Sequence, residues 1–157
     1  MSQWPKQDSK SMTEFYGPVG TGQTTLKLPY AMRLTWAPGQ KITQITCHSK
    51  VADSLRSIFM ETLTQYGEGR VVSLGLDRFS GCLNVRKMRG GNAWSIHSWG
   101  AAVDLDDERN QLRWNKTRAV FARPEYVPFW SIVAGHGWVS LGQARDFDWM
   151  HFQAARL

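Results

Sequence analysis

The segment Ser95–Asp104 reads SIHSWGAAVD and follows the pattern S-x-H-x-x-G-x-A-x-D. Gly100 permits a tight turn, because glycine adopts backbone conformations that other residues avoid. Side chains alternate between the two faces of a strand, so Asp104 shares a face with the small Ala102, while the apolar residues beside them face the core. The segment therefore predicts a turn followed by a strand that directs Asp104 toward the same space as His97.

A histidine and a carboxylate in this relation are good zinc ligands, and a third ligand would leave one open position for water. The third ligand we predict is His151, in the segment DFDWMHFQ. Asp148 lies three residues before it, where a carboxylate can stand beside the metal without binding it and act as a general base. Asp146 is the competing carboxylate, at slightly worse spacing.

These residues resemble the zinc D,D-peptidases and L-alanyl-D-glutamate peptidases of bacteria and their phages. That family includes the VanX- and VanY-type enzymes and many phage endolysins, and it is related in fold to hedgehog and lysostaphin. The first motif of the family is matched in full by Ser95, His97, Gly100, Ala102 and Asp104, and the second by Asp148, Trp149 and His151. The similar segments extend from about Gly81 to Gln153, nearly half of the chain.

The resemblance implies a role for each matched residue. His97, Asp104 and His151 would bind zinc, and Asp148 would take a proton from the attacking water and pass it to the leaving amine. One departure concerns the base, because the D-Ala-D-Ala dipeptidases of the family use Glu where this chain has Asp148.

Two further roles are implied more weakly. The stretch Gly81–Arg86 is similar to a family segment whose arginine polarises the scissile carbonyl, so Arg86 would stabilise the oxyanion. Ser95 would orient the substrate or a metal ligand. Arg86 also belongs to a basic cluster with Lys87 and Arg89, which we expect to contact phosphate or an anionic peptide.

The hydrophobic pattern predicts an α+β fold with a small, mainly antiparallel sheet and flanking helices, and the resemblance implies the hedgehog and D-Ala-D-Ala peptidase type of that fold. Apolar residues at helical spacing predict a helix over Val51–Tyr66, with Ser49 as its N-cap and Gly67 as its end, and a second helix over about 124–134. The predicted strands are Ile42–Cys47, Val71–Leu76, Gly100–Leu105 and Trp149–Phe152. Residues 1–30 are rich in Gly, Pro, Ser and Thr and are expected to form an irregular arm of a single zinc peptidase domain that spans 1–157.

Composition narrows the function classes. The 157 residues are 42% hydrophobic, which excludes a largely disordered chain, and no apolar run is long enough to span a membrane. Nineteen Lys and Arg against 13 Asp and Glu give a net charge of +6, which favours an anionic partner such as a cell envelope. A nucleic-acid binder would also explain this charge and the eight Trp, but the chain carries no recognition motif and we expect no such partner.

The two cysteines, the other two histidines and one acidic run are predicted to have structural roles. Cys47 and Cys82 have no metal-site spacing and are expected to be reduced and buried. His48 and His136 are expected to be structural, and Asp106–Glu108 is predicted to be a solvated turn.

The sequence thus favours a zinc-dependent hydrolase of the peptidoglycan stem peptide, of the phage endolysin type, that cleaves between L-Ala and D-Glu. A D-Ala-D-Ala carboxypeptidase and a non-catalytic zinc or wall-binding module are the alternatives. The first residues carry no secretory signal, so we expect the chain to be made in a bacterial cytoplasm and to reach the wall through a membrane lesion made by a holin. We also expect it to be a monomer.

Overall fold

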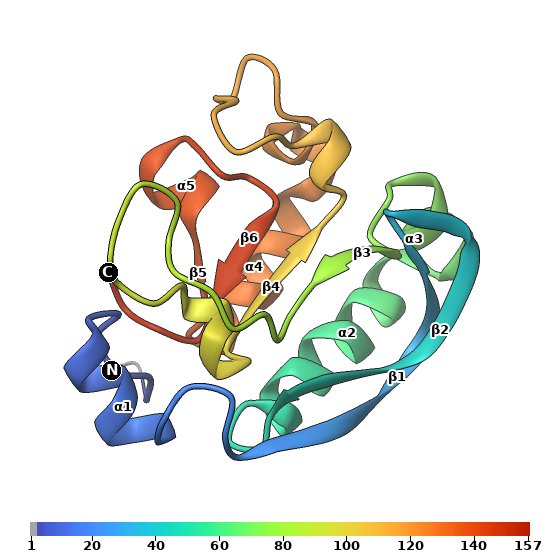
Figure 1. Cartoon of the computed structure of the whole chain (residues 1–157). Coiled ribbons are helices and arrows are strands. Elements are labelled where there is room, and N and C mark those ends of the chain that lie inside the picture. Colours follow the sequence, from blue (N-terminus) through green and yellow to red (C-terminus); the bar gives the residue numbers. More distant parts are fainter. Residues whose placement is uncertain (1–2) are drawn as a thin grey trace.

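The computed structural model describes residues 3–157 and contains an open six-stranded mixed sheet with five α-helices (Figure 1). The strand order is β2-β1-β3-β4-β6-β5, and every neighbouring pair is antiparallel except β1 with β3. The strands are β1 (Gln23–Leu34), β2 (Ala37–His48), β3 (Arg78–Gly81), β4 (Ala102–Leu105), β5 (Val139–Ser140) and β6 (His151–Gln153). The α-helices are α1 (Ser9–Tyr16), α2 (Ala52–Tyr66), α3 (Glu68–Ser73), α4 (Val127–Gly135) and α5 (Leu141–Arg145). The α+β class and the mainly antiparallel sheet predicted from the sequence are confirmed.

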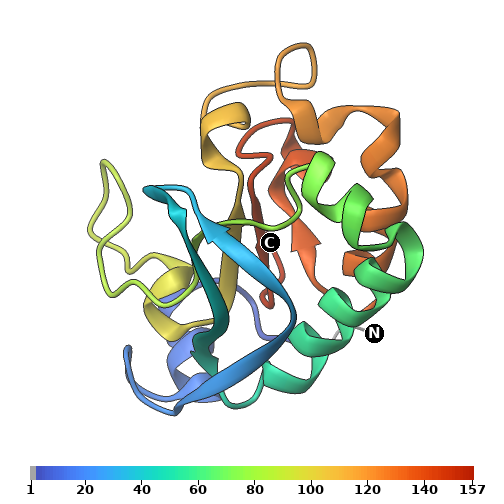
Figure 2. The same ribbon diagram turned by 90° about the vertical axis from the view of Figure 1, so that its right-hand side faces the viewer.

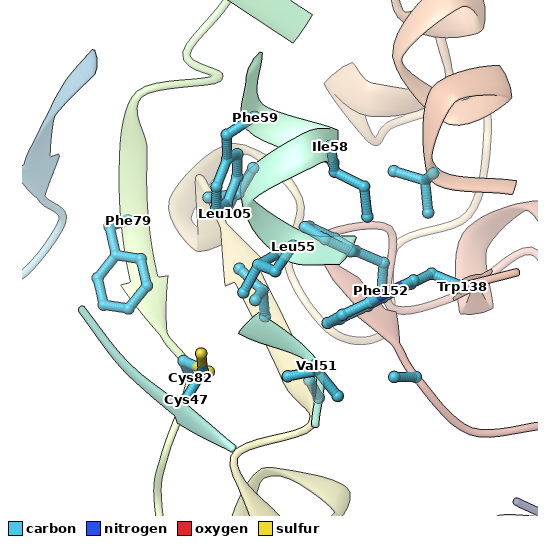
Figure 3. Close-up of a cluster of buried hydrophobic side chains, with 14 of the residues drawn as sticks. Cys47, Val51, Leu55, Ile58, Phe59, Phe79, Cys82, Leu105, Trp138 and Phe152 are labelled. Atoms are coloured by element: carbon cyan, nitrogen blue, oxygen red, sulfur yellow. The ribbon is translucent and has the colours of Figure 1, made fainter. Parts of the chain in front are cut away.

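Helix α2 provides much of the apolar core. Leu55, Ile58 and Phe59 are fully buried at helical spacing, and they pack with Phe79, Leu105 and Phe152 from the sheet (Figure 3). Both helices α2 and α4 lie on one side of the sheet, while the loop of residues 84–95 projects from the other side (Figure 2). The core is therefore concentrated behind the sheet and leaves the opposite face of β4 and β6 for polar side chains.

Several predicted elements are confirmed within a few residues. Helix α2 ends at Gly67, where φ is 77°, and α4 follows a short 3-10 turn at Pro124–Tyr126. The N-cap is Val51 rather than Ser49, and it makes no side-chain cap hydrogen bond. The predicted strand Ile42–Cys47 lies within β2, and β4 and β6 overlap the other two predicted strands at the site.

The predicted strand Val71–Leu76 is wrong. This segment completes α3 and a turn, with Val71 fully buried and Val72 exposed. Two adjacent β-branched residues favour a strand, but Gly67 starts a new helical turn, and the burial of Val71 and Leu74 at a spacing of three follows the helical period.

The expectation of an irregular arm over residues 1–30 is wrong for the helix α1 and for the start of β1, while residues 1–2 lie outside the described residues. Asp8 caps α1 by accepting a hydrogen bond from the Ser11 amide, and β1 begins at Gln23. Pro29 argues against a strand in the sequence, because proline has no N–H group to donate to a strand ladder. The β1–β2 register jumps between Lys27 and Met32, so Pro29 lies in a bulge where no ladder donor is required.

Two expected environments can be compared with the structure. Cys47 and Cys82 are buried, as predicted, and burial raises the pKa of Cys47 to about 12 (Figure 3). The prediction of a solvated turn over Asp106–Glu108 is wrong for Asp106. This residue is fully buried and pairs with Arg78 at 2.9 Å and with Arg109. Within residues 3–157, no helix is long and apolar enough to cross a membrane.

Candidate metal centre

The structure brings His97, Asp104 and His151 together, with one possible ligand atom from each within 4.8 Å of the others. His97 lies in a 3-10 turn (Ile96–Trp99), Asp104 on β4 and His151 at the start of β6. Strands β4 and β6 lie side by side at the centre of Figure 1, with the 3-10 turn just before β4. Residues that are far apart in the sequence therefore converge on one face of the sheet.

The turn before β4 has the geometry that its sequence predicts. Ser95 is the N-cap and accepts a hydrogen bond from the His97 amide at 3.3 Å, which fixes the direction of the turn. Gly100 ends the turn in the left-handed conformation, with φ at 66°. A Cβ atom there would lie 2.2 Å from the Gln23 side chain and 2.9 Å from the His48 amide nitrogen. Gly100 is thus required by both conformation and space.

The ring orientation of His97 is set by a backbone carbonyl. Its Nδ1 donates a hydrogen bond to the Cys82 carbonyl at 2.8 Å, which leaves Nε2 of the neutral ring with a lone pair. This Nε2 lies 3.1 Å from Oδ2 of Asp104, but among the described residues it has no partner with hydrogen-bond geometry. A buried imidazole nitrogen without a hydrogen bond is well suited to accept a metal ion.

Asp104 lies between the two imidazoles. Its Oδ1 is 3.0 Å from His151 Nδ1 and its Oδ2 is 3.1 Å from His97 Nε2. Burial disfavours ionisation of this carboxyl, but the neighbouring imidazole of His97 and the hydrogen-bonded imidazole of His151 outweigh it and hold the pKa of Asp104 well below the usual range. Asp104 is therefore anionic and is stabilised by a positive charge beside it.

His151 supplies that charge when no metal is present. Burial favours the neutral ring, but the hydrogen bond to Asp104 and the negative charges of Asp104 and Asp148 outweigh it and raise the pKa of His151 to about 9. The proton on Nδ1 occupies the position where a cation would sit between the two side chains. The two imidazoles and the carboxylate form a donor set that could hold a metal ion.

Asp148 lies beside this set without being part of it. Its backbone is in the left-handed region at a φ of 55°, which few residues other than Gly, Asn and Asp adopt. Burial raises the pKa of Asp148 to about 6, Asp104 adds repulsion, and His151, His97 and Arg86 act in the opposite direction. The carboxyl of Asp148 is therefore close enough to His151, Asp104 and His97 to interact with their charges. Its pKa allows it to accept and release a proton near neutral pH.

Asp146, the competing carboxylate, has a different task. Its Oδ1 accepts hydrogen bonds from the Lys116 amide at 2.6 Å and from the Trp149 indole at 3.1 Å. These bonds attach the loop of residues 111–118 to the segment that carries His151. The carboxylate is thereby engaged in holding the backbone together.

Arg86 lies at the base of the loop of residues 84–95. Its backbone N–H donates to Ser98 Oγ at 3.0 Å, and its carbonyl accepts from the Ser95 amide at 2.9 Å. Its partly exposed guanidinium acts on the charge of Asp148. The structure therefore places Arg86 near the predicted base.

The other two histidines lie outside the set. His48 Nε2 donates to the Tyr16 carbonyl at 2.8 Å and its Nδ1 accepts from the Lys50 amide at 3.1 Å. His136 pairs with Glu61 on α2. Both engage in packing contacts between elements, in line with the structural interpretation.

Two residues that hold the site were not found from the sequence. The Cys82 carbonyl orients His97, and the Gln153 side chain contacts His151 Nε2 at 2.8 Å. A backbone carbonyl leaves no mark in a sequence. The place of Gln153 can be predicted, because it follows His151 at a spacing of two and so lies on the same face of β6.

Comparisons of the chain with protein-family models, with curated proteins and with solved structures gave no match.

Proposed function

We propose that this chain is a zinc-dependent hydrolase of the peptidoglycan stem peptide, of the endolysin type, that cuts between L-Ala and D-Glu. The observation that carries the proposal is the convergence of His97 Nε2, Asp104 and His151 Nδ1 on one point, with Asp148 beside them. The order and spacing of these residues match the two motifs of the peptidase family described above.

Each residue in the proposed reaction has one task. A bound zinc ion would act as a Lewis acid toward water and the scissile carbonyl. Asp148 takes a proton from the attacking water and delivers it to the leaving amine, for which a pKa of about 6 is appropriate. Arg86 stabilises the negative charge that develops on the carbonyl oxygen. The bonds of Asp146 to Lys116 and Trp149 support the choice of Asp148 as the base.

The charge around the site favours an anionic substrate. No Asp or Glu occurs from Gly81 to Val103, or from Asn110 to Pro124. The first segment contains Arg86, Lys87 and Arg89, and the second contains Arg113, Lys116, Arg118 and Arg123. The D-Glu residue of the stem peptide has a free carboxylate beside the proposed scissile bond, and a guanidinium can bind it with two hydrogen bonds.

Both basic segments also carry an aromatic platform. Lys87 Nζ lies 3.7 Å from the centre of the Trp94 ring, and the Arg118 guanidinium carbon lies 3.9 Å from the centre of the Trp114 ring. These contacts hold the cations in place at the surface. We propose that they contribute adhesion to the anionic cell envelope, in addition to their part in substrate binding.

The test is digestion of purified sacculi with the zinc-loaded chain, followed by mass spectrometry of the soluble products. The proposed cleavage yields fragments with a new amino-terminal D-Glu. Release of free D-Ala with the L-Ala–D-Glu bond intact would instead identify a D-Ala-D-Ala carboxypeptidase. Binding to sacculi without any released product would identify a wall-binding module and contradict the enzymatic proposal.

A further inference from the structure

The side chain of Gln153 lies between the metal site and the first residues of the chain. It is 1% exposed, and its Oε1 faces His151 Nε2 at 2.8 Å. Its amide nitrogen donates to the Ala155 carbonyl at 3.1 Å and to Gln7 Oε1 at 3.0 Å. Both the oxygen and the nitrogen of the Gln153 amide are thus hydrogen-bonded.

The Ala155 carbonyl decides which way the amide points. A carbonyl can only accept a hydrogen bond, so the NH₂ group of Gln153 must face Ala155 and its oxygen must face His151. An amide oxygen also only accepts, so His151 Nε2 must donate. In a neutral ring the proton is then on Nε2, and the lone pair is on Nδ1, which lies 3.0 Å from Asp104.

We infer that Gln153 is a positioning residue that fixes the tautomer of His151, so that Nδ1 and not Nε2 is presented to the metal. The inference rests on the zinc site of the proposed function. It extends that site to the amino-terminal segment, since Gln7 supplies one of the two acceptors that hold the amide.

The amino-terminal segment is itself attached to Arg156, three residues after Gln153. The Gln7 amide donates to the Arg156 carbonyl at 2.8 Å, and the Arg156 amide donates to the Pro5 carbonyl at 2.7 Å. Arg156 Nε also donates to the Trp4 carbonyl at 2.8 Å. Residues 4–7 are therefore fixed to the segment that follows β6, and through the bond of Gln7 to Gln153 they would contribute to metal binding.

The test uses the full chain with ¹⁵N-labelled histidine and three variants. Gln153→Leu removes the acceptor, Gln153→Glu keeps one, and Gln143→Leu makes the same change at an exposed position of α5. In the zinc-loaded parent chain we expect a His151 ring with a hydrogen-bonded Nε2–H and a metal-bound Nδ1. In Gln153→Leu we expect zinc affinity to fall by about 10- to 100-fold and the ring to populate both coordination modes. Gln153→Glu keeps an acceptor for His151 Nε2 but loses the donor to Ala155 and Gln7, so it should favour the single mode at a lower zinc affinity than the parent chain. Gln143→Leu should match the parent chain.

A second variant covers the case in which Gln153→Leu does not fold. Gln7→Ala removes only one of the two acceptors of the amide, so it should lower zinc affinity in the same direction by a smaller factor. Unchanged zinc affinity and an unchanged His151 Nε2–H signal in either folded variant would overturn the inference. If the parent chain binds no zinc, the proposed function fails. The His151 Nε2–H signal of the metal-free chain still decides the role of Gln153: it should have the chemical shift of a hydrogen-bonded proton in the parent chain and lose that shift in Gln153→Leu.

Discussion

Asp104 and His151 are direct partners across the antiparallel β4–β6 pair, and Oδ1 of the first lies 3.0 Å from Nδ1 of the second. A shift of this pairing by one residue would move one of the two side chains to the other face of the sheet. The strand register therefore assembles two of the three proposed ligands, and only His97 has to be supplied by a separate turn.

The chain is expected to bind about one zinc ion per molecule, because His97, Asp104 and His151 leave one coordination position open. Elemental analysis of the purified chain measures the ratio, and a chelator should abolish activity. His97→Ala should bind less than one equivalent, whereas His136→Ala, outside the set, should bind as much as the parent chain. Full lytic activity of the metal-free chain would rule out the zinc site as the catalytic centre.

Asp148→Asn should retain zinc and lose about a hundredfold or more of its turnover, since the amide cannot accept the proton of the attacking water. The measurement is the initial rate on sacculi beside the metal content. Asp146→Asn is the matched control, with the same chemical change two residues away. It should keep most of its turnover but unfold at a lower denaturant concentration, because Asp146 holds Lys116 and Trp149. The reverse pattern would assign the base to Asp146.

The metal-free chain should lose stability as the pH rises from about 6.5 to about 9. The pKa of His151 is near 6.5 in an unfolded chain and about 9 in the folded chain, so the folded state binds more protons in this window. The free energy of unfolding then falls with rising pH. Asp148, with a pKa of about 6, titrates below the window, and Asp104 loses its contribution only in strong acid.

Urea denaturation of the chelated chain at several pH values between 6 and 9 measures this slope. Zinc competes with the His151 proton, so zinc affinity should rise over the same window, and zinc binding near pH 7 should release about one proton. Calorimetry in buffers of different ionisation enthalpy counts that proton. A metal-free chain whose stability is flat from pH 6.5 to 9 would show that His151 does not hold the proton assigned to it.

Arg86→Ala should reduce turnover while metal content and stability stay close to those of the parent chain. The partly exposed guanidinium is expected to act on the developing oxyanion, while the backbone bonds of residue 86 to Ser95 and Ser98 remain. Arg86→Lys should restore little, because a flexible ammonium does not reproduce the planar fork. Arg123→Ala removes an equal charge from the other basic segment and serves as the control. Equal rates for Arg86→Ala and the control would reduce Arg86 to one surface charge among several.

Gly100→Ala should destabilise the fold by about 2 to 4 kcal/mol, the combined effect of a left-handed backbone and a crowded Cβ. The nearest atoms are those of the Gln23 side chain and the His48 amide nitrogen. Gly91→Ala, where a Cβ would meet nothing within 4 Å, is the control and should stay within about 0.5 kcal/mol of the parent. Thermal unfolding measures both. Equal stability of the two variants would show that the turn before β4 can relax.

The sequence was informative where a residue type is tied to local geometry. Gly100 and the alternation after it predicted both the turn and β4, and the helical spacing of Leu55, Ile58 and Phe59 predicted α2. The sequence failed where distant contacts decide. Pro29 is compatible with β1 only because β1 bulges away from the β2 ladder there, and Asp106 is buried only because Arg78 and Arg109 pair with it.

The same distinction holds at the candidate site. His97, Asp104, His151 and Asp148 were identified by their spacing, because strand alternation and short segments determine where they point. Gln153 depends on Gln7, which is 146 residues away in the chain. No local pattern reports a contact of that range.

Strand β2 is the outer strand of the sheet, so one side of its backbone has no strand partner among residues 3–157. An exposed strand edge is a template on which a second copy of the chain can pair and aggregate. Lys41 is exposed on this strand, and the bulge of β1 between Lys27 and Met32 interrupts the flat β1–β2 ladder that such pairing needs. Pro29 lies in that bulge on β1, so the residue that argued against a strand in the sequence also contributes to the interruption of the ladder beside this open edge.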